Sequence, residues 1–538
     1  MRKGKKKHHL PEGSCPADGC VHEAHHRGMG RRDFLTNLGL IGTGSLLLSG
    51  LPLRRLAASP LLTPLLSAAG DRILIVIRLK GGNDGLNTFV PLFDYSRYAS
   101  YRPLLKIPTS NLISLDAKYA IPDFASDLKY LWDRGMMKVI QNVGYPNSDL
   151  SHFASTDIWD SAHTTIASKS GWLGRYLWNE NPDFLTNPPS DPLAIQIGGD
   201  GNILFFNEDN VNMAMNVIDP EALYQIAQSG ALYPVSGTAT CYYQDQVDFL
   251  KSMINTTFYQ SQSIKAAYDA GRNNVTFAGG ELGEALALVS RLIQGGLTTP
   301  IYMLTLDGFD THAQQDTRHP ELLTTFAGAV RSLFDDLEAG GMDRRVLLMT
   351  FSEFGRRVND NGSLGTDHGT AAPLMVFGSV LNGNGFLGDD VNLVDLDNNG
   401  NLKHTVDFRQ VYTTILQDWM CVDELTADTL LGGAYSRLAL GFDCSTTRAA
   451  AVETVQRYHQ LRYDNGIPFI VVNLPQSAHI KLEAYDLLGR TVASTSNDYY
   501  SAGLHKITFP GIGRWPAGAY AYRLYINGSM EGGKAQKH

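Results

Sequence analysis

Two short apolar runs, IYMLTL at 301–306 and VLLMTF at 346–351, enclose the segment that decides the fold. Both runs have the length and composition of buried strands. The stretch between them carries apolar residues at helical spacing, namely Phe326, Val330, Leu333, Phe334 and Leu337. Gly340 and Gly341 end that pattern, as glycines commonly do after a helix. The order of strand, helix and strand predicts an α/β sheet covered by helices.

The same alternation extends over a core that we place at residues 70–445. Further buried strands are predicted at 72–79 (RILIVIRL), 138–144 (KVIQNVG) and 373–378 (PLMVFG). Residues 205–295 carry mainly helical patterns and predict a helical insertion or a cap on the sheet.

A separate unit is predicted at the C-terminal end, after a linker at 446–464. From residue 465 to 538 apolar and polar residues alternate between regular turns, which predicts a small all-β sandwich. Its turns read YDLLGR at 485–490, SAGLH at 501–505 and PAGAY at 516–520. This spacing resembles the C-terminal sorting domain of the type IX secretion system. A carbohydrate-binding or immunoglobulin-like module is the alternative.

The first 69 residues have the features of an export signal. A basic stretch at 2–9 leads to Arg31-Arg32 followed by Phe34-Leu35, and then to an apolar run at 38–53. This order resembles the twin-arginine signal, whose machinery exports folded proteins. An uncleaved membrane anchor is the alternative, although the run is short for a span. We therefore expect passage through the periplasm of a Gram-negative bacterium to the cell surface or the medium, with no stable span in the mature chain.

Composition narrows the possible partners. The chain has 538 residues with 45 Lys and Arg against 54 Asp and Glu, a net charge of -9, so a nucleic-acid binder held by phosphate contacts is excluded. The five cysteines are too few for a disulfide framework, and Cys421 with Cys444 is the one candidate pair.

Acidic residues and histidines follow three of the predicted strands. Asp84 follows the strand at 72–79, Asp307 and His312 follow the run at 301–306, and Asp367 and His368 follow the run at 346–351. Ligands bind at the carboxyl ends of strands in such sheets. Carboxylate and imidazole are the ligands that zinc, manganese and related ions accept, so we predict a divalent-metal site there.

The order of these groups resembles the alkaline phosphatase superfamily, including phosphopentomutases and cofactor-independent phosphoglycerate mutases. The resemblance implies one or two divalent ions, zinc, manganese or similar, and a nucleophilic Ser or Thr. Carried over by position, the implied ligands are Asp84, Asp307, His312, Asp367, His368 and His404.

Two serines in NSDLSHF at 147–153 are candidate nucleophiles. Ser151 fits the start of a helix, where free N–H groups stabilise negative charge. Ser148 is favoured instead by the mutases, whose serine lies four residues before a His. A plain helix-capping role is the alternative for either residue.

A fuller match covers residues 72–415. The motifs are GGNDGLN, SHFASTDIW, GWLGRYL, LDGFDTHAQQ, SEFGRR, GTDHG and DFRQVY, in this order. They are similar to the exported domain-of-unknown-function 1501 family, which implies an alkaline phosphatase-like mixed sheet sandwiched by helices but no established reaction. SHF is the prominent serine motif of that family, which favours Ser151.

The remaining candidates concern the substrate. Arg356 and Arg357 are either clamps for a phosphate or sulfate or structural ion-pair partners. No Cys-x-Pro-x-Arg motif occurs, which excludes formylglycine sulfatase chemistry. We expect a metal-dependent hydrolase of phosphate or sulfate esters, acting on a small-molecule or glycan ester. A non-catalytic surface protein that binds a glycan or an envelope partner is the alternative.

Overall fold

The computed structural model describes residues 72–164, 168–182, 184–185, 188–198, 202–228, 244–444 and, with short gaps, 459–537. The chain divides between Ala449 and Ala450 into two compact units. The predicted export signal at 1–69 lies outside the described residues, and so does most of the predicted linker. In the part that the structure describes, no helix is long and apolar enough to cross a membrane.

A nine-stranded mixed sheet forms the centre of the first unit. Its main path runs in the order β11 (Gly385–Leu387), β5 (Met137–Gly144), β10 (Ala372–Phe377), β9 (Val346–Phe351), β1 (Ile73–Lys80), β8 (Ile301–Asp307), β6 (Ala194–Ile197) and β7 (Ala214–Asn216), and β12 (Val406–Asp407) pairs with β5. All five predicted strands belong to this sheet, so the predicted α/β fold is confirmed.

Strand β1 lies between β8 and β9 and runs parallel to both. Ile77 pairs with Leu304 on one side and with Thr350 on the other. Every residue from Ile73 to Leu79 is buried, because helices cover both faces of the sheet. This explains why the strand reads as an almost unbroken apolar run. Strand β10 is antiparallel to β9 and β5, which makes the sheet mixed.

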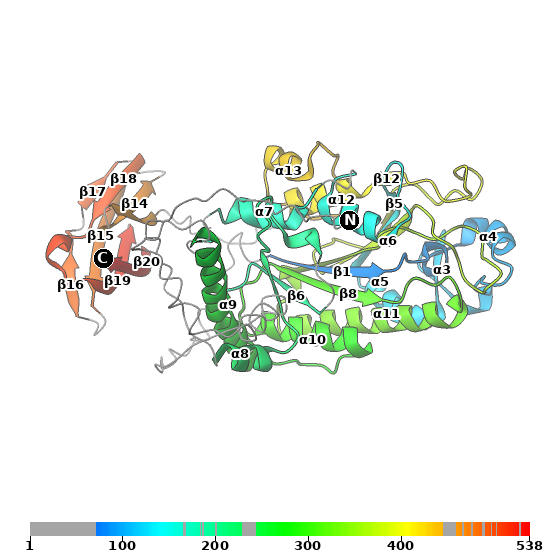
Figure 1. Ribbon diagram of the computed structural model, residues 1–538, viewed down its shortest axis with the longest axis horizontal. Coiled ribbons are helices and arrows are strands. Elements are labelled where there is room, and N and C mark those ends of the chain that lie inside the picture. Colours follow the sequence, from blue (N-terminus) through cyan, green and yellow to red (C-terminus); the bar gives the residue numbers. More distant parts are fainter. Residues whose placement is uncertain are drawn as a thin grey trace, which may run out of the picture. The chain divides into compact units, whose positions relative to one another are not determined.

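Two helical layers cover the sheet (Figure 1). One face packs against α5 (Ser126–Asp133), α10 (Gly280–Gln294) and α11 (Gln315–Ala339). The other face packs against α6 (His152–Ser161), α7 (Trp172–Glu180), α12 (Phe408–Thr414), the π-helical turn η7 (Ile415–Trp419) and α13 (Glu424–Leu431). The predicted helix between the two deciding strands is α11, and Gly340 caps its end as expected.

The region predicted as a helical insertion contributes to the main body. It contains α8 (Pro220–Gln228), α9 (Gln244–Ala270) and α10, of which α10 packs on the sheet. It also supplies β7, which pairs with β6 at the sheet edge. Smaller elements surround the glycine turn after β1: α3 (Gly85–Thr88), β2 (Val90–Pro91), α4 (Tyr95–Tyr101), β3 (Leu112–Ser114) and β4 (Tyr119–Pro122).

The second unit consists of antiparallel strands. One sheet has the order β13 (His459–Asp464), β14 (Ile467–Leu474) and β18 (Gly503–Thr508). The other contains β16 (Thr491–Ser494), β15 (Ala478–Tyr485), β19 (Gly518–Ile526) and β20 (Ser529–Lys537), with β17 (Asp498–Tyr500) paired to β15. Ile470, Leu482 and Leu524 are buried in its core. The predicted small all-β unit is therefore confirmed.

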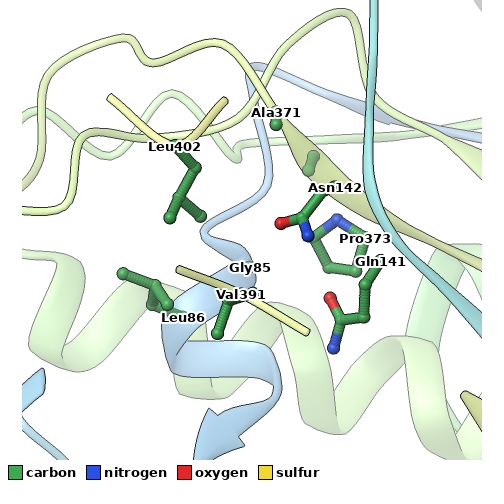
Figure 2. A pocket seen from close by; sticks show the side chains of 9 residues that line it. Gly85, Leu86, Gln141, Asn142, Ala371, Pro373, Val391 and Leu402 are labelled. Carbon is green, nitrogen blue, oxygen red and sulfur yellow. The ribbon is translucent and has the colours of Figure 1, made fainter. Parts of the chain in front are cut away.

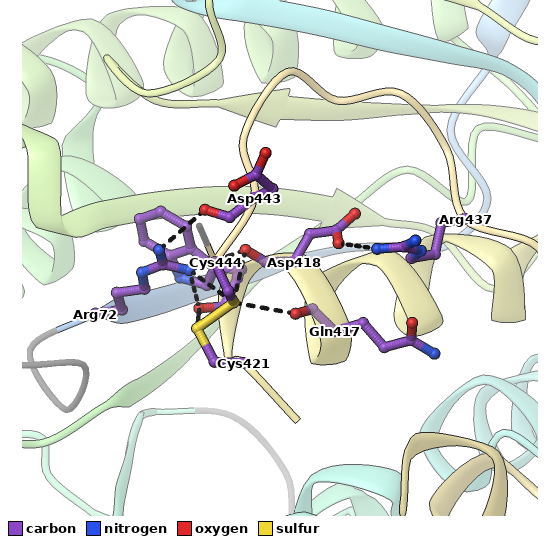
Figure 3. Close-up of a disulfide and its surroundings, with 8 residues drawn as sticks. Arg72, Gln417, Asp418, Cys421, Arg437, Asp443 and Cys444 are labelled. Carbon is purple, nitrogen blue, oxygen red and sulfur yellow. Dashed lines mark hydrogen bonds and ion pairs between the residues drawn. A yellow bond between two sulfur atoms is a disulfide. The ribbon is translucent and has the colours of Figure 1, made fainter. Parts of the chain in front are cut away.

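A disulfide joins Cys421 to Cys444 with a Cα–Cα distance of 5.6 Å, which confirms the predicted pair. Figure 3 shows Arg72 beside it. The Arg72 guanidinium donates to the carbonyls of Asp418 and Trp419 at 2.9 and 2.7 Å. Arg72, where the described core begins, and Cys444, where it ends, are therefore both bound to residues 418–421.

Candidate metal centre

Three imidazoles and one carboxylate meet beyond the carboxyl ends of the central strands. Asp310 Oδ1 lies 3.2 Å from His312 Nε2, 3.2 Å from His368 Nε2 and 3.4 Å from His152 Nε2. We refer to His152, Asp310, His312 and His368 as the His/Asp cluster. Ligand atoms of His152, Asp310 and His368 all lie within 4.8 Å of one another, so these three can hold a metal ion.

The cluster draws its members from three segments. His152 is the first residue of α6, Asp310 and His312 lie between β8 and α11, and His368 lies between β9 and β10. Since β8 and β9 both run parallel to β1, their carboxyl ends reach the same edge of the sheet. These side chains therefore gather at the edge of the sheet where the sequence predicts the site.

The outer nitrogens of the three rings each face an acceptor. His368 Nδ1 lies 2.8 Å from the Leu150 carbonyl, which can only accept, so this nitrogen carries the proton. His152 Nδ1 lies 2.8 Å from Glu353 Oε1, and His312 Nδ1 lies 3.4 Å from Asp367 Oδ1. Protons on the outer nitrogens leave the Nε2 lone pairs directed at the centre, the arrangement found around metal-ligating histidines.

Two further observations fit a cation at this point. His152 Nε2 is buried and has no hydrogen-bond partner among the described residues. Below the cluster, the buried Phe354 ring packs against His152 and His368 with centroid distances of 4.9 and 4.4 Å. The Phe354 ring excludes water from one side of the cluster, which strengthens the electrostatic interactions within it.

The charge states of Asp310 and His368 suit a metal ligand set, whereas His152 retains a proton more readily. Burial raises the pKa of Asp310, but the hydrogen bond and the charge of Arg356 outweigh it and lower that pKa to about 2. The Asp310 carboxylate is therefore ionised at neutral pH. Burial lowers the pKa of His368, which favours the neutral ring that a metal requires. The hydrogen bond to Glu353 raises the pKa of His152.

Arg356 holds the loops of the site together. Its buried guanidinium donates to Asp310 Oδ1 at 2.6 Å and to the carbonyls of Gly81, Gly82, Phe309 and Thr366. Few of its donors remain for a substrate anion, so these contacts favour the structural alternative over the predicted anion clamp. Gly81 makes the close approach possible: its φ is 121°, and a Cβ there would lie 2.2 Å from the Asp310 nitrogen.

Three of the predicted metal ligands are not part of the His/Asp cluster. Asp84 is 1% exposed and forms a two-point ion pair with Arg102, which already compensates its charge. Asp307 is 65% exposed and pairs with Lys80 at 2.7 Å. His404 is half-buried beside Gly144, and within the described residues it has no contact with the cluster. The structure therefore does not bring these three predicted ligands into the cluster.

Asp367 lies at the rim rather than at the centre. Its Oδ1 is 3.4 Å from His312 Nδ1 and 3.3 Å from Asn361 Nδ2. It therefore contacts the outer nitrogen of a cluster histidine and orients that ring.

The two candidate nucleophiles differ in their surroundings. The Ser148 hydroxyl donates to the Tyr145 carbonyl at 2.8 Å. Ser151 is exposed, precedes His152 as the N-cap of α6, and makes no capping bond with its side chain. Of the two, Ser151 thus has the exposed hydroxyl without a capping bond, and it directly precedes a member of the cluster in the chain.

Sequence reasoning missed His152, Asp310 and Glu353. His152 was visible in the SHF motif, which we interpreted only for its serine. Asp310 was visible two residues before His312, but the spacing from Asp307 to His312 drew the assignment to the wrong carboxylate. Glu353 lies in SEFGRR and carries no signal of its own, because its role depends on Gly81 and His152, which are distant in sequence.

Two cavities lie away from the cluster. Figure 2 shows one between Gly85, Gln141, Asn142 and Pro373, with about 10 Å³ of room for the centre of a water molecule. The other has about 170 Å³ and lies between Ile107 and α11. Neither cavity is lined by a member of the His/Asp cluster.

The matched family covers much of this site. Residues 238–431 match the family described as Protein of unknown function (DUF1501). This segment contains Asp310, His312, Glu353 and His368, whereas His152 lies before it. No curated protein matches the sequence.

Solved structures with a similar course of the chain include members of the alkaline phosphatase superfamily. One from Vibrio parahaemolyticus has 10% identity and a TM-score of 0.29 over 81% of this chain and 83% of that one. The alkaline phosphatase of the Antarctic bacterium TAB5 has 9% identity and a TM-score of 0.28, over 59% and 94%. A Bacteroides thetaiotaomicron protein of glycosaminoglycan metabolism has 9% identity and a TM-score of 0.30, over 86% and 89%. At these values the similarity carries no argument about chemistry.

Proposed function

We propose that the chain is a metal-dependent hydrolase of phosphate or sulfate esters. The observation that carries this proposal is the convergence of three imidazole Nε2 atoms on the Asp310 carboxylate, with the exposed Ser151 directly preceding His152 in the chain. His152, Asp310, His312 and His368 would hold one divalent ion, which supplies Lewis-acid polarisation of the ester oxygens.

Ser151 would act as the nucleophile. It stands at the N-terminus of α6, whose free N–H groups and positive dipole end stabilise an incoming anion. In the first step Ser151 Oγ gives up its proton and bonds to phosphorus or sulfur, the bond to the leaving oxygen breaks, and the proton ends on that oxygen. Water then hydrolyses the ester on Ser151 and releases phosphate or sulfate.

The supporting residues orient this machinery. Glu353 holds His152 through Nδ1, Asp367 contacts His312, and the Leu150 carbonyl fixes His368. We propose one ion rather than two, because the cluster supplies a single carboxylate, Asp84 is buried in its ion pair with Arg102, and Asp307 is not part of the cluster.

The alternative is a non-catalytic surface protein that keeps the fold and one metal. The contacts of Arg356 favour this alternative. Its guanidinium donates to backbone carbonyls and to Asp310, so few of its N–H groups remain for a substrate anion. Turnover separates the two proposals, since both include a bound ion.

We also propose export, with delivery to the cell surface or the medium by the twin-arginine and type IX machineries. The Cys421–Cys444 disulfide supports an oxidising compartment. Replacing Arg31 and Arg32 by Lys should retain the protein in the cytoplasm, and deleting residues 465–538 should retain it in the periplasm. Unchanged fractionation of both variants would contradict these two assignments.

The deciding experiment measures metal and turnover together. The full mature chain is purified, its zinc and manganese are determined by elemental analysis, and generic phosphate monoesters, diesters and sulfate esters are tested. We expect about one ion per chain. Ser151→Ala should keep the ion and lose turnover, His368→Ala should lose both, and Ser148→Ala should keep both. Absence of metal and of turnover would overturn the hydrolase.

A further inference from the structure

An exposed aromatic residue directly follows a member of the His/Asp cluster in the chain. Phe153 directly follows His152 in the first turn of α6 and is 86% exposed, the largest value for a large apolar side chain among the described residues. The same helix buries Ile158 and Trp159 against the sheet. Phe153 therefore contributes nothing to the core, and exposing an apolar side chain of this size to water is unfavourable.

A second apolar side chain lies on the loop between β9 and β10 that carries His368. Leu364 lies three residues before Asp367, is 40% exposed, and has a φ of 55°. A left-handed conformation is unfavourable for a residue with a Cβ, and such residues persist where the surroundings enforce them.

The loop around Leu364 is firmly held. Asn361 Oδ1 accepts from the backbone of Ser363 and Gly365 at 2.9 and 3.1 Å, while its Nδ2 donates to the His312 carbonyl at 3.0 Å. The Leu364 carbonyl accepts from Gln315 at 2.8 Å. The backbone thus fixes an apolar side chain on the loop that contacts His312 and carries His368.

We propose that Phe153 and Leu364 select the substrate, and that it is an ester whose leaving group presents an apolar ring face. The inference rests on the proposed hydrolase and deepens it. The ester group would meet the cluster and Ser151, while the ring of the leaving group packs on Phe153, as aromatic side chains pack with flat apolar surfaces. Phenols and pyranose sugars both offer such a face, whereas a short alkyl group does not.

The test compares matched esters. For the wild-type chain, Phe153→Ala, Phe153→Trp and Leu364→Ala, kcat/KM is measured with the phenyl, glucosyl and methyl ester of the acid that is hydrolysed. Leu425→Ala is the control, because Leu425 is 77% exposed on α13 and is not part of the cluster. Circular dichroism checks that each variant is folded.

We expect Phe153→Ala to lower kcat/KM about tenfold for a ring-bearing ester, the size of one aromatic contact. Leu364→Ala should cause a smaller loss, and Phe153→Trp should retain the rate. The methyl ester should be unaffected, and Leu425→Ala should change nothing. Whether the phenyl or the glucosyl ester responds identifies the ring. An equal loss for all three esters, or no loss, would overturn the inference.

Binding distinguishes this inference from the hydrolase itself. Calorimetry on the zinc-loaded chain compares phenylphosphonate and glucosyl phosphonate with methylphosphonate, none of which requires turnover. A preference for a ring that disappears in Phe153→Ala supports the ring-binding role even if no ester is cleaved. Equal affinity for the three phosphonates, or binding of none, overturns it.

Discussion

The Nε2 atoms of His312 and His368 lie 2.9 Å apart. The outer nitrogen of His368 donates to a carbonyl and that of His312 faces a carboxylate, so both rings direct an Nε2 lone pair inward. Two lone pairs at this distance repel each other unless a proton or a cation lies between them. The pair therefore favours binding of a positive charge at the centre of the His/Asp cluster.

Added zinc should consequently stabilise the folded chain. At a zinc concentration of about 100 times Kd, the free energy of unfolding should rise by about 2.7 kcal/mol. Differential scanning calorimetry with and without zinc, and after chelation, measures the shift in Tm. His368→Ala should abolish the shift, and His404→Ala, which removes a histidine outside the cluster, should keep it. A shift that survives in His368→Ala contradicts the site.

Glu353→Gln should weaken metal binding without removing a ligand. Glu353 is 1% exposed, and its Oε1 accepts from both His152 Nδ1 and the Gly81 backbone at 2.8 Å. Loss of such an outer-shell carboxylate typically lowers metal affinity by about 10–100-fold. Competition with a zinc-binding dye measures the change in Kd.

Asp367→Asn is the matched comparison for Glu353→Gln. Asp367 contacts His312 at the longer distance of 3.4 Å, and its side chain is 52% exposed. Its replacement should therefore reduce the affinity less than Glu353→Gln does. Equal losses of zinc affinity in the two variants would contradict the expectation that the buried Glu353–His152 contact contributes more than the exposed Asp367–His312 contact.

Much of this fold was predictable because it depends on local pattern. The strands β1, β8 and β9 are continuous apolar runs, and His312 and His368 lie in the loops that follow β8 and β9. Which carboxylate faces the centre was not predictable. Asp307 is the last residue of β8 and pairs across the sheet with Lys80, after which Gly308 turns the chain with a φ of 112°. Asp310 reaches the centre only because of that turn.

Asp84 illustrates a second limit. The sequence correctly put it at the end of β1, but its partner Arg102 lies 18 residues further on, in a segment without a chemical motif. An ionised carboxylate is buried only when a partner compensates it. Which partner does so is decided by tertiary packing, and a spacing pattern contains no information about it.

Arg356 should contribute strongly to the free energy of unfolding, in addition to its contact with the metal site. Its guanidinium is fully buried and serves several backbone carbonyls as well as Asp310. Because Arg356→Lys leaves some of these buried acceptors without a donor, we expect the free energy of unfolding to fall by about 3 kcal/mol. Arg437→Lys, in which the half-exposed cation that pairs with Asp418 is kept, should cost less than about 1 kcal/mol. Urea unfolding of both variants measures the difference.

His319 should make the chain sensitive to acid. It is buried against Asn83, and burial lowers its pKa to about 4. In the unfolded chain its pKa is about 6.5, so between these values the unfolded state binds more protons and stability falls as the pH falls. The loss should reach about 3 kcal/mol by pH 4. His319→Gln should flatten the unfolding free energy in this pH window, and an unchanged pH profile would contradict the assignment.

The disulfide should stabilise the core by closing a loop around its last turn. Cys421 and Cys444 are 23 residues apart in sequence, and a link of this length typically contributes about 3 kcal/mol. Cys421→Ser/Cys444→Ser should lose that amount in urea unfolding, and a reducing agent should produce the same loss in the wild-type chain. The double variant should not respond to the reducing agent. Arg72 donates to the carbonyls of Asp418 and Trp419 in the same turn. Because the disulfide and these hydrogen bonds each hold part of the turn, adding Arg72→Ala to the double variant should lower its free energy of unfolding further.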